Sequence, residues 1–196
     1  LTSHFKWVTC HDALDRLKRD AGRLGLAKMA GFNVPAVLDD EVALVAHSSG
    51  DLFLEEYRFK VKTSEDLGGI IDALASLMRR DQAHSALEKG LVIVSNDLFA
   101  HLARHATPVN AHVALNANKT AKVGALWYEE TLPPETLLYV CASASNARKK
   151  DLPLGAREIL GAATRVLFGT HPWLQLGGNE TVGMGWCAVS ILGMEG

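Results

Sequence analysis

At 196 residues, with 48% hydrophobic and 21% charged residues, the chain has the composition of a globular protein that buries one core. No apolar run reaches the length of a membrane span, so no membrane partner is expected. The three cysteines are scattered and exclude a disulfide framework or a CxxC zinc site, which indicates a reducing, cytoplasmic setting. The net charge of −2 argues against an evenly basic nucleic-acid binder but allows a local stripe of lysines and arginines.

The first third of the chain alternates predicted strands and helices. A short strand ends at Cys10, and an amphipathic helix follows over residues 12–24. The apolar face of this helix consists of Leu14, Leu17, Ala21 and Leu24. After a loop, two strands are predicted at 41–46 and 51–59, and we expect them to pair around the turn Ser48-Ser49-Gly50.

The middle of the chain continues this alternation. An amphipathic helix is predicted over 69–80, and the continuous apolar run at 91–94 is typical of a strand buried on both faces. Ser95 is placed to cap the next helix, whose inward side chains are Leu98, Phe99 and Leu102. Helices and strands in this order predict an α+β fold.

Two groups of side chains with catalytic or metal-binding chemistry lack a partner. Cys10-His11-Asp12 has no third catalytic group at an informative spacing, so we interpret it as structural. His101 and His105 lie four residues apart on one helix face, but no third ligand is nearby. We therefore predict no metal site in this chain.

Residues 109–134 are predicted to form a long antiparallel hairpin. In its first strand four apolar residues alternate with polar ones, which indicates one buried face. These residues are Val109, Ala111, Val113 and Leu115. The connecting segment 116–120 has turn chemistry because asparagine tolerates positive φ and bonds its own backbone. Lys119 and Lys122 make the tip mildly basic, and Glu129-Glu130 closes the base.

The last third is predicted to end in a glycine-rich loop. A buried strand is expected at 135–142 and an amphipathic helix at 154–168, with Ala163, Val166 and Leu167 among its inward side chains. The polar loop between them carries the densest positive run of the chain, Arg148, Lys149 and Lys150.

Residues 177–185 contain four glycines, which allow tight turns and a close approach of backbone N–H groups to an anion. A strand is expected at 186–192. The loop is neither a Walker A loop, because Gly-Lys-Ser/Thr is missing, nor a Rossmann fingerprint, because a strand follows it.

Three segments together resemble one protein family. They are FxWVTC at residues 5–10, KTxxVGALWYEExLPxETL at residues 119–137 and GGNETVGMG at residues 177–185. In this order they are similar to the backbone subunit of type III-B CRISPR effectors, the RAMP-superfamily protein of the Cmr complex. The resemblance spans nearly the whole chain.

The resemblance implies a ferredoxin-like, RRM-related core from which the hairpin projects as a thumb. It implies a single RAMP-type domain over residues 1–196 with the hairpin inserted at about 109–130. Because family members carry a further N-terminal part, we expect this chain to lack their first core strand and the loop after it. The expected partners are guide RNA, complementary target RNA, other Cmr subunits and further copies of the chain in a filament.

Lys119 and Lys122 at the basic tip of the hairpin are expected to contact RNA phosphates. The resemblance adds His112 on the hairpin. It also adds the residues of the glycine-rich loop, Gly177, Gly178, Asn179, Thr181, Gly183, Met184 and Gly185. Members usually have arginine where His112 stands. Histidine is mostly uncharged near neutral pH, so we expect one phosphate contact to be weaker here.

The resemblance further implies that intact members cut target RNA with a divalent metal, Mg²⁺ or Mn²⁺, and an Asp in the loop after the first core strand. No residue of this chain corresponds to that Asp. Glu129 falls at a family position implicated in cleavage and is the one catalytic candidate. We therefore expect an RNA-binding subunit that polymerises along guide RNA in antiviral defence. No cofactor is expected in this chain, and the endoribonuclease activity belongs to the intact family member.

A second hypothesis comes from a different class of protein. A small nucleotide or phosphoester enzyme could use the 177–185 loop as an anion cradle, with Glu129 or Glu130 as its base. The loop contains no lysine or arginine, which argues against this alternative.

Overall fold

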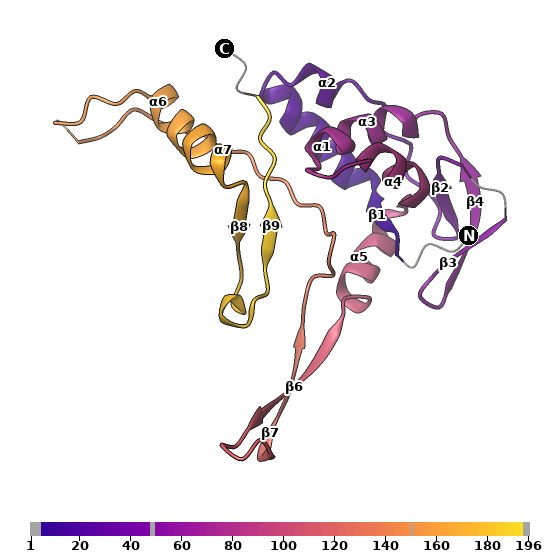
Figure 1. Ribbon diagram of the computed structural model, residues 1–196. Helices are drawn as coiled ribbons and strands as arrows, with labels where there is room; N and C mark the ends of the chain where they lie inside the picture. Colours follow the sequence, from indigo (N-terminus) through magenta and orange to yellow (C-terminus); the bar gives the residue numbers. More distant parts are fainter. Residues whose placement is uncertain (1–4, 48–49, 150, 194–196) are drawn as a thin grey trace. The chain divides into compact units, whose positions relative to one another are not determined.

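The computed structural model of the protein describes residues 5–47, 50–149 and 151–193 (Figure 1). It confirms the α+β class, with a five-stranded mixed sheet and two separate two-stranded sheets. Ser48, Ser49 and Lys150, which the sequence placed in a turn and in a basic run, lie outside the described residues. None of the described helices is long and apolar enough to cross a membrane.

The chain divides into two compact units, each built from three segments. Unit 1 comprises Leu1–Ala13, Pro35–Ser64 and Gly90–Leu138, and unit 2 comprises Leu14–Val34, Glu65–Lys89 and Tyr139–Gly196. All strands of the large sheet belong to unit 1.

The large sheet has the strand order β1-β5-β2-β4-β3. Its strands are β1 (Trp7–Cys10), β2 (Val42–Val45), β3 (Asp51–Leu54), β4 (Tyr57–Thr63) and β5 (Leu91–Val94). The pairs β1–β5 and β2–β4 are parallel, whereas β2–β5 and β3–β4 are antiparallel. The sheet is therefore mixed, with short strands contributed by three separate parts of the chain.

The core of unit 1 lies on this sheet. Every residue of β2 and β5 is buried, as expected for continuous apolar runs. The buried cluster consists of Ala43, Val45, Leu52, Phe59, Val92, Val94 and Leu98. Gly90 leaves room for the Trp7 ring, because a Cβ atom there would lie 2.8 Å from it. The indole N–H of Trp7 donates to the carbonyl oxygen of Glu135 at 2.9 Å.

One predicted strand pairing is wrong. The sequence suggested that the strands before and after Gly50 pair with each other, but β2 pairs with β4 in parallel and β3 pairs with β4. The predicted strand 51–59 is interrupted by a turn at Glu55, where φ is 51°, and Glu56. Both glutamates are exposed, so the chain reverses where charged side chains remain in water.

Helix α5 (Asn96–His105) leads from the sheet to the predicted hairpin. The Ser95 hydroxyl accepts a hydrogen bond from the Leu98 N–H at 3.1 Å, so the predicted N-cap is confirmed. The strands β6 (Val109–Leu115) and β7 (Ala121–Glu130) then form a two-stranded antiparallel sheet. The hairpin therefore exists at the predicted place.

Unit 2 contains four short helices in its first two segments. They are α1 (His11–Arg23), which begins in unit 1, α2 (Ala27–Ala30), α3 (Leu67–Leu77) and α4 (Ala83–Gly90). Leu14, Leu17 and Ala21 are buried as predicted, but Leu24 is half exposed. The reason is local: α1 ends at Arg23, and Gly25 turns the chain with φ of 72°.

The third segment of unit 2 corrects the predicted helix 154–168. The structure has α6 (Ala156–Gly161), a π-helical turn η1 (Ala162–Leu167) and α7 (Phe168–Thr170). Val166 is 72% exposed, and Ala163 and Leu167 are also exposed instead of facing inward. A π turn contains more residues than an α turn, so it rotates the following side chains away from the expected stripe.

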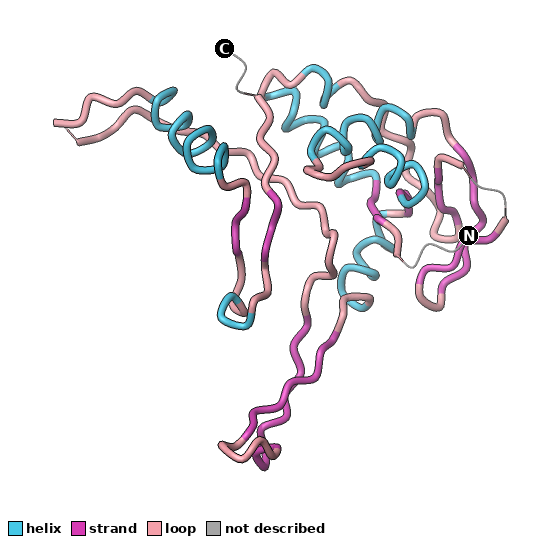
Figure 2. Tube along the Cα trace, in the orientation of Figure 1, coloured by secondary structure: helices cyan, strands magenta, loops and turns pink. Residues whose placement is uncertain are grey.

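The predicted strand 135–142 is also wrong. Figure 2 draws the stretch after β7 as loop, and no described strand pairs with it. Leu138 and Val140 are exposed, the latter to 87%. An apolar run becomes a strand only where a neighbouring strand takes up its backbone hydrogen bonds, and the sequence pattern does not encode that neighbour.

The chain ends in a second hairpin. β8 (Trp173–Gln175) and β9 (Trp186–Ala188) pair antiparallel, and the glycine-rich segment with the 3-10 helix η2 (Glu180–Val182) connects them. The final strand is shorter than the predicted range 186–192.

Candidate nucleic-acid interface

The tip of the β6–β7 hairpin is held by backbone hydrogen bonds and by the side chains of its own turn. The Asn116 N–H donates to the Thr120 carbonyl at 2.8 Å, and the Lys119 N–H donates to the Asn116 carbonyl at 2.9 Å. The Asn118 carboxamide oxygen accepts from both the N–H and the hydroxyl of Thr120, at 3.2 and 2.6 Å. This network fixes Lys119 at a φ of 64° and leaves its side chain exposed.

A bulge in β7 places the second lysine. Val113 pairs with Leu126, and the same register would pair Leu115 with Gly124, but Leu115 pairs with Ala121. The extra residues of β7 loop out, and Gly124 takes a φ of 74° that side chains disfavour. Lys122 is exposed and its neighbour Val123 is 97% exposed. The tip therefore presents two lysines and an apolar side chain to solvent.

The predicted buried face of the hairpin is exposed, which corrects the sequence analysis. Val109, Val113 and Leu115 are 63%, 46% and 59% exposed, and Leu126 and Tyr128 on the paired strand are exposed as well. The alternation was identified correctly, but a two-stranded sheet needs a further layer to bury its apolar face. Alternation shows which residues share a face and not whether that face is covered.

The opposite face of the hairpin holds a compact group of three side chains. The His112 and Trp127 rings stack with centroids 5.5 Å apart and an angle of 19°. The Trp127 indole N–H donates to Glu129 at 2.7 Å, and the other Glu129 oxygen lies 3.7 Å from His112 Nε2. His112 Nε2 is buried and has no hydrogen-bond partner among the described residues. A phosphate that approached His112 would meet the Glu129 carboxylate beside it, which weakens this predicted contact.

The two adjacent carboxylates at the base of the hairpin do not act together. Glu129 faces His112, whereas Glu130 accepts a short hydrogen bond from the Thr107 hydroxyl. Neighbouring residues of a strand point to opposite faces, so the two cannot chelate one ion. Within the described ranges, no three His, Cys, Asp or Glu side chains could hold a metal ion together.

The glycine-rich loop is held mainly by its own backbone. The N–H groups of Val182 and Met184 donate to the Asn179 carbonyl at 3.2 and 3.1 Å, and that of Gly183 donates to Glu180 at 3.0 Å. The Gln175 carboxamide donates to the carbonyls of Glu180 and Met184, each at 2.9 Å. Three of the loop's N–H groups are therefore engaged inside the loop, which weakens the idea of a complete anion cradle.

The glycines of this loop have different structural roles. Gly177, Gly183 and Gly185 have φ of 111°, 84° and 80°, a region in which other residues are strained. A Cβ atom on Gly185 would also lie 1.8 Å from the Leu176 carbonyl oxygen. Gly178 has neither constraint, since its φ is not positive and the space around it is open.

The remaining predicted loop contacts differ in their exposure. Thr181 is exposed, whereas Asn179 and Met184 are half-buried. Of the predicted loop residues, Gly178 and Thr181 thus combine exposure with freedom from backbone constraints.

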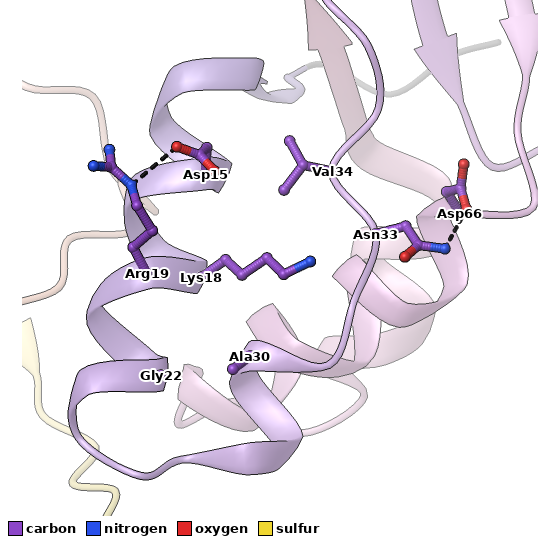
Figure 3. A pocket seen from close by; sticks show the side chains of 8 residues that line it. All are labelled: Asp15, Lys18, Arg19, Gly22, Ala30, Asn33, Val34 and Asp66. Carbon is purple, nitrogen blue, oxygen red and sulfur yellow. Dashed lines mark hydrogen bonds and ion pairs between the residues drawn. The ribbon is translucent and has the colours of Figure 1, made fainter.

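A hollow of about 700 Å³ in unit 2 lies between α1 and the start of α3 (Figure 3). Its lining residues are Asp15, Lys18, Arg19, Gly22, Ala30, Asn33, Val34 and Asp66. Lys18 extends into the hollow, with its ammonium 6.0 Å from the centroid of the Phe32 ring. Arg19 pairs with Asp15 at 3.0 Å, and Asn33 donates to Asp66 at 3.2 Å. Equal numbers of acidic and basic side chains make this hollow a poor site for a polyanion.

Cys10, His11, His101 and His105 make contacts within the fold. Burial raises the pKa of the Cys10 thiol, although backbone hydrogen bonds from Ala13 and Asp12 oppose this shift, and a thiol with a raised pKa is a weak nucleophile. His11 Nδ1 donates to the Pro35 carbonyl at 2.7 Å. The His101 and His105 rings lie 4.6 Å apart, and His101 Nε2 is 2.8 Å from the Tyr57 hydroxyl. All three cysteines are unpaired.

The predicted site residues therefore form two groups. His112, Lys119, Lys122 and Glu129 belong to the hairpin of unit 1, and the predicted glycine-loop residues belong to unit 2. Sequence reasoning missed the group formed by His112, Trp127 and Glu129. Part of this group could have been found, because the two-residue spacing of Trp127 and Glu129 puts both side chains on one face of a strand.

Comparisons with known proteins agree on one family. The sequence profile of the RAMP superfamily matches residues 2–188. The chain is 30% identical over 195 residues to the CRISPR system Cmr endoribonuclease Cmr4 of Pyrococcus furiosus. This match covers 95% of the chain but only 62% of the relative's length, so the chain spans less than two thirds of that protein.

Solved structures share the fold. The crystal structure of oligomeric Cmr4 from Pyrococcus furiosus is similar with a TM-score of 0.58 and 18% identity, covering 97% of this chain and 66% of that one. The cryo-EM structure of the type III-B Cmr-beta complex bound to cognate target RNA contains a similar chain, with a TM-score of 0.54, 15% identity and coverage of 95% and 62%. Because the profile match extends over nearly all of its residues, the chain belongs to the RAMP superfamily.

Proposed function

We propose that this chain is an RNA-binding backbone subunit of a type III-B CRISPR effector that polymerises along guide RNA in antiviral defence. The observation that carries the proposal is the 30% identity to Cmr4 over 95% of the chain. The fold supports it, because a Cmr4 solved as an oligomer and a chain of a target-bound Cmr complex are similar structures. The partners would be guide RNA, complementary target RNA, other Cmr subunits and further copies of this chain, in the cytoplasm.

The hairpin supplies the first part of an RNA interface. Lys119 and Lys122 are exposed at its tip and can approach phosphate groups, while the exposed Val123 can contact a base. His112 would add a weaker contact, because Glu129 competes for it. The exposed apolar face with Leu126 and Tyr128 is suited to unstacked bases or to a protein neighbour.

The glycine-rich loop supplies a second part. Gly178 and Thr181 are exposed, so RNA backbone can approach this side of the loop closely. The N–H groups of Val182, Gly183 and Met184 already have acceptors and would orient the loop instead of binding phosphate. Cleavage of target RNA with a divalent metal would be a property of the intact family member, with Glu129 as the one contribution from this chain.

The test is reconstitution of the chain with guide RNA. The purified chain should retain RNA, raise the ratio of absorbance at 260 to 280 nm and form particles whose length grows with guide length in electron micrographs. A chain that binds no RNA and stays monomeric at all guide lengths would contradict the proposal. The alternative function, a small nucleotide or phosphoester enzyme, would instead give turnover of a small phosphoester. No contact among the described residues favours this enzyme over the RNA-binding subunit.

A further inference from the structure

A second hollow in unit 2, of about 330 Å³, has a different character from the one in Figure 3. Two arginines, Arg79 and Arg165, line it together with the apolar side chains of Phe168, Val189 and Ile191. No aspartate or glutamate is among its lining residues in the described part of the chain. The hollow therefore combines two positive charges with an apolar wall.

The arginines of α1 are paired with carboxylates, whereas Arg79 and Arg165 have no anionic partner among the residues that the structure describes. Arg16 and Arg23 pair with Asp20, and Arg19 pairs with Asp15. Neither Arg79 nor Arg165 makes an ion pair with any residue in the described ranges. Two like charges in one hollow repel each other, so an anion bound between them would be stabilised by both.

The Arg165 guanidinium lies directly against Gly161. A Cβ atom on Gly161 would lie 2.8 Å from Arg165 Nη2, so any larger residue there requires the guanidinium to shift. Gly161 lies one helical turn before Arg165 and is buried. Between them the Thr164 hydroxyl donates to the Leu160 carbonyl at 2.7 Å, within the π-helical turn that carries both Thr164 and Arg165.

We propose that Arg79 and Arg165 bind one phosphodiester group of RNA, with the adjoining base against Phe168. A guanidinium group presents two N–H donors that match two phosphate oxygens, which gives a charge-assisted bidentate contact. The hollow has the size of a small ligand site, and its apolar wall is suited to the face of a base. This inference rests on the proposed function, namely that the chain binds RNA.

The test measures the affinity of the full chain for labelled guide RNA at several salt concentrations. Arg79→Ala and Arg165→Ala should each weaken binding about tenfold and lower the salt slope by roughly one unit. Arg165→Lys keeps the charge but loses the bidentate geometry, so it should weaken binding by less than Arg165→Ala. Arg157→Ala removes the same charge from an exposed position outside the hollow and should bind like the wild type.

Gly161→Ala is the sharpest variant because it changes no charge. The added methyl group displaces the Arg165 guanidinium, while alanine favours the helix more than glycine does. We expect weaker RNA binding at a melting temperature that is equal to or higher than that of the wild type. Wild-type affinity in Gly161→Ala and in both arginine-to-alanine variants would overturn the inference and leave the proposed function intact.

Binding of adenosine monophosphate and of poly-glutamate tests whether the hollow serves a ligand other than RNA. If the wild-type chain binds no RNA but adenosine monophosphate binds in a way that depends on Arg165, the hollow serves a free nucleotide and both proposals fail. If poly-glutamate, and not RNA, loses affinity in the Arg79→Ala/Arg165→Ala double variant, the hollow serves an acidic protein and only this inference is overturned.

Discussion

The two hairpins of this chain hold their connections in different ways. Between β6 and β7, the side chains of Asn116, Asn118 and Thr120 hold the turn, and lysines extend from it. Between β8 and β9, backbone hydrogen bonds hold the loop together with the Gln175 carboxamide, and three of its glycines have positive φ. Both hairpins contain residues with positive φ, but the first presents two lysines, whereas the second connection contains three glycines with positive φ and no lysine or arginine.

This difference predicts how each hairpin responds to substitution. Exposed lysines can be removed without changing the backbone, and their loss acts on binding through charge, which depends on salt. Glycines with positive φ cannot be replaced without strain, so their loss acts first on folding. The comparison also singles out Gly178, which belongs to the second loop but has no strained φ.

The largest effect is expected for Gly185→Ala. The new Cβ atom would overlap the Leu176 carbonyl oxygen, at a φ of 80°, so the β8–β9 hairpin should lose about 3 kcal/mol of folding free energy. Hydrogen exchange of the β8 and β9 amides, together with thermal unfolding, measures this loss. Gly178→Ala is the matched control and should exchange like the wild type. Equal protection in both variants would show that backbone geometry does not limit this loop.

A smaller effect, on binding alone, is expected for Lys119→Ala with Lys122→Ala. Two lost phosphate contacts should lower the salt slope of RNA affinity by roughly two units, at an unchanged melting temperature. Removal of the same charge from β4, by Lys60→Ala with Lys62→Ala, is the control and should leave the slope nearly unchanged. An unaltered slope in the first variant would remove the hairpin tip from the RNA interface.

Gly178→Val tests whether the second loop also lies close to RNA. Since the position is open and unstrained, the variant should fold normally but block a close approach of the RNA backbone. We expect about tenfold weaker binding, ~1.4 kcal/mol, with a nearly unchanged salt slope because no charge is lost. Normal affinity would assign the loop a structural role only, whereas a lowered melting temperature would show that Gly178 is constrained after all.

The smallest effect is expected for Gly124→Ala in the bulge of β7. Alanine at a φ of 74° should cost about 1 kcal/mol and shift the register of the hairpin tip. Amide chemical shifts of Leu115 and Ala121, which pair across the bulge, report that register. If they stay unchanged, the bulge does not depend on the glycine, and the side-chain network of the turn is sufficient to hold it.

The sequence by itself determined the local features of this protein. The apolar run at β5, the Ser95 cap and the turn between β6 and β7 follow from neighbouring residues, and the structure confirms each. The RAMP family was also identified from local strings, and the profile match confirms it. The RNA contacts of His112, Lys119, Lys122 and the glycine loop, and the single-domain organisation, stay predictions.

Only the tertiary structure decided which segments pair and which faces are covered. β2 pairs with β4 instead of β3, and the apolar stretch 135–142 finds no strand partner among the described residues. It also brought Arg79 and Arg165, far apart in the chain, to one hollow whose described lining residues include no carboxylate. The physical reason is the same in each case. Strand pairing, burial and ion pairing depend on neighbours that are distant in sequence, whereas periodicity and turn chemistry are written in adjacent residues.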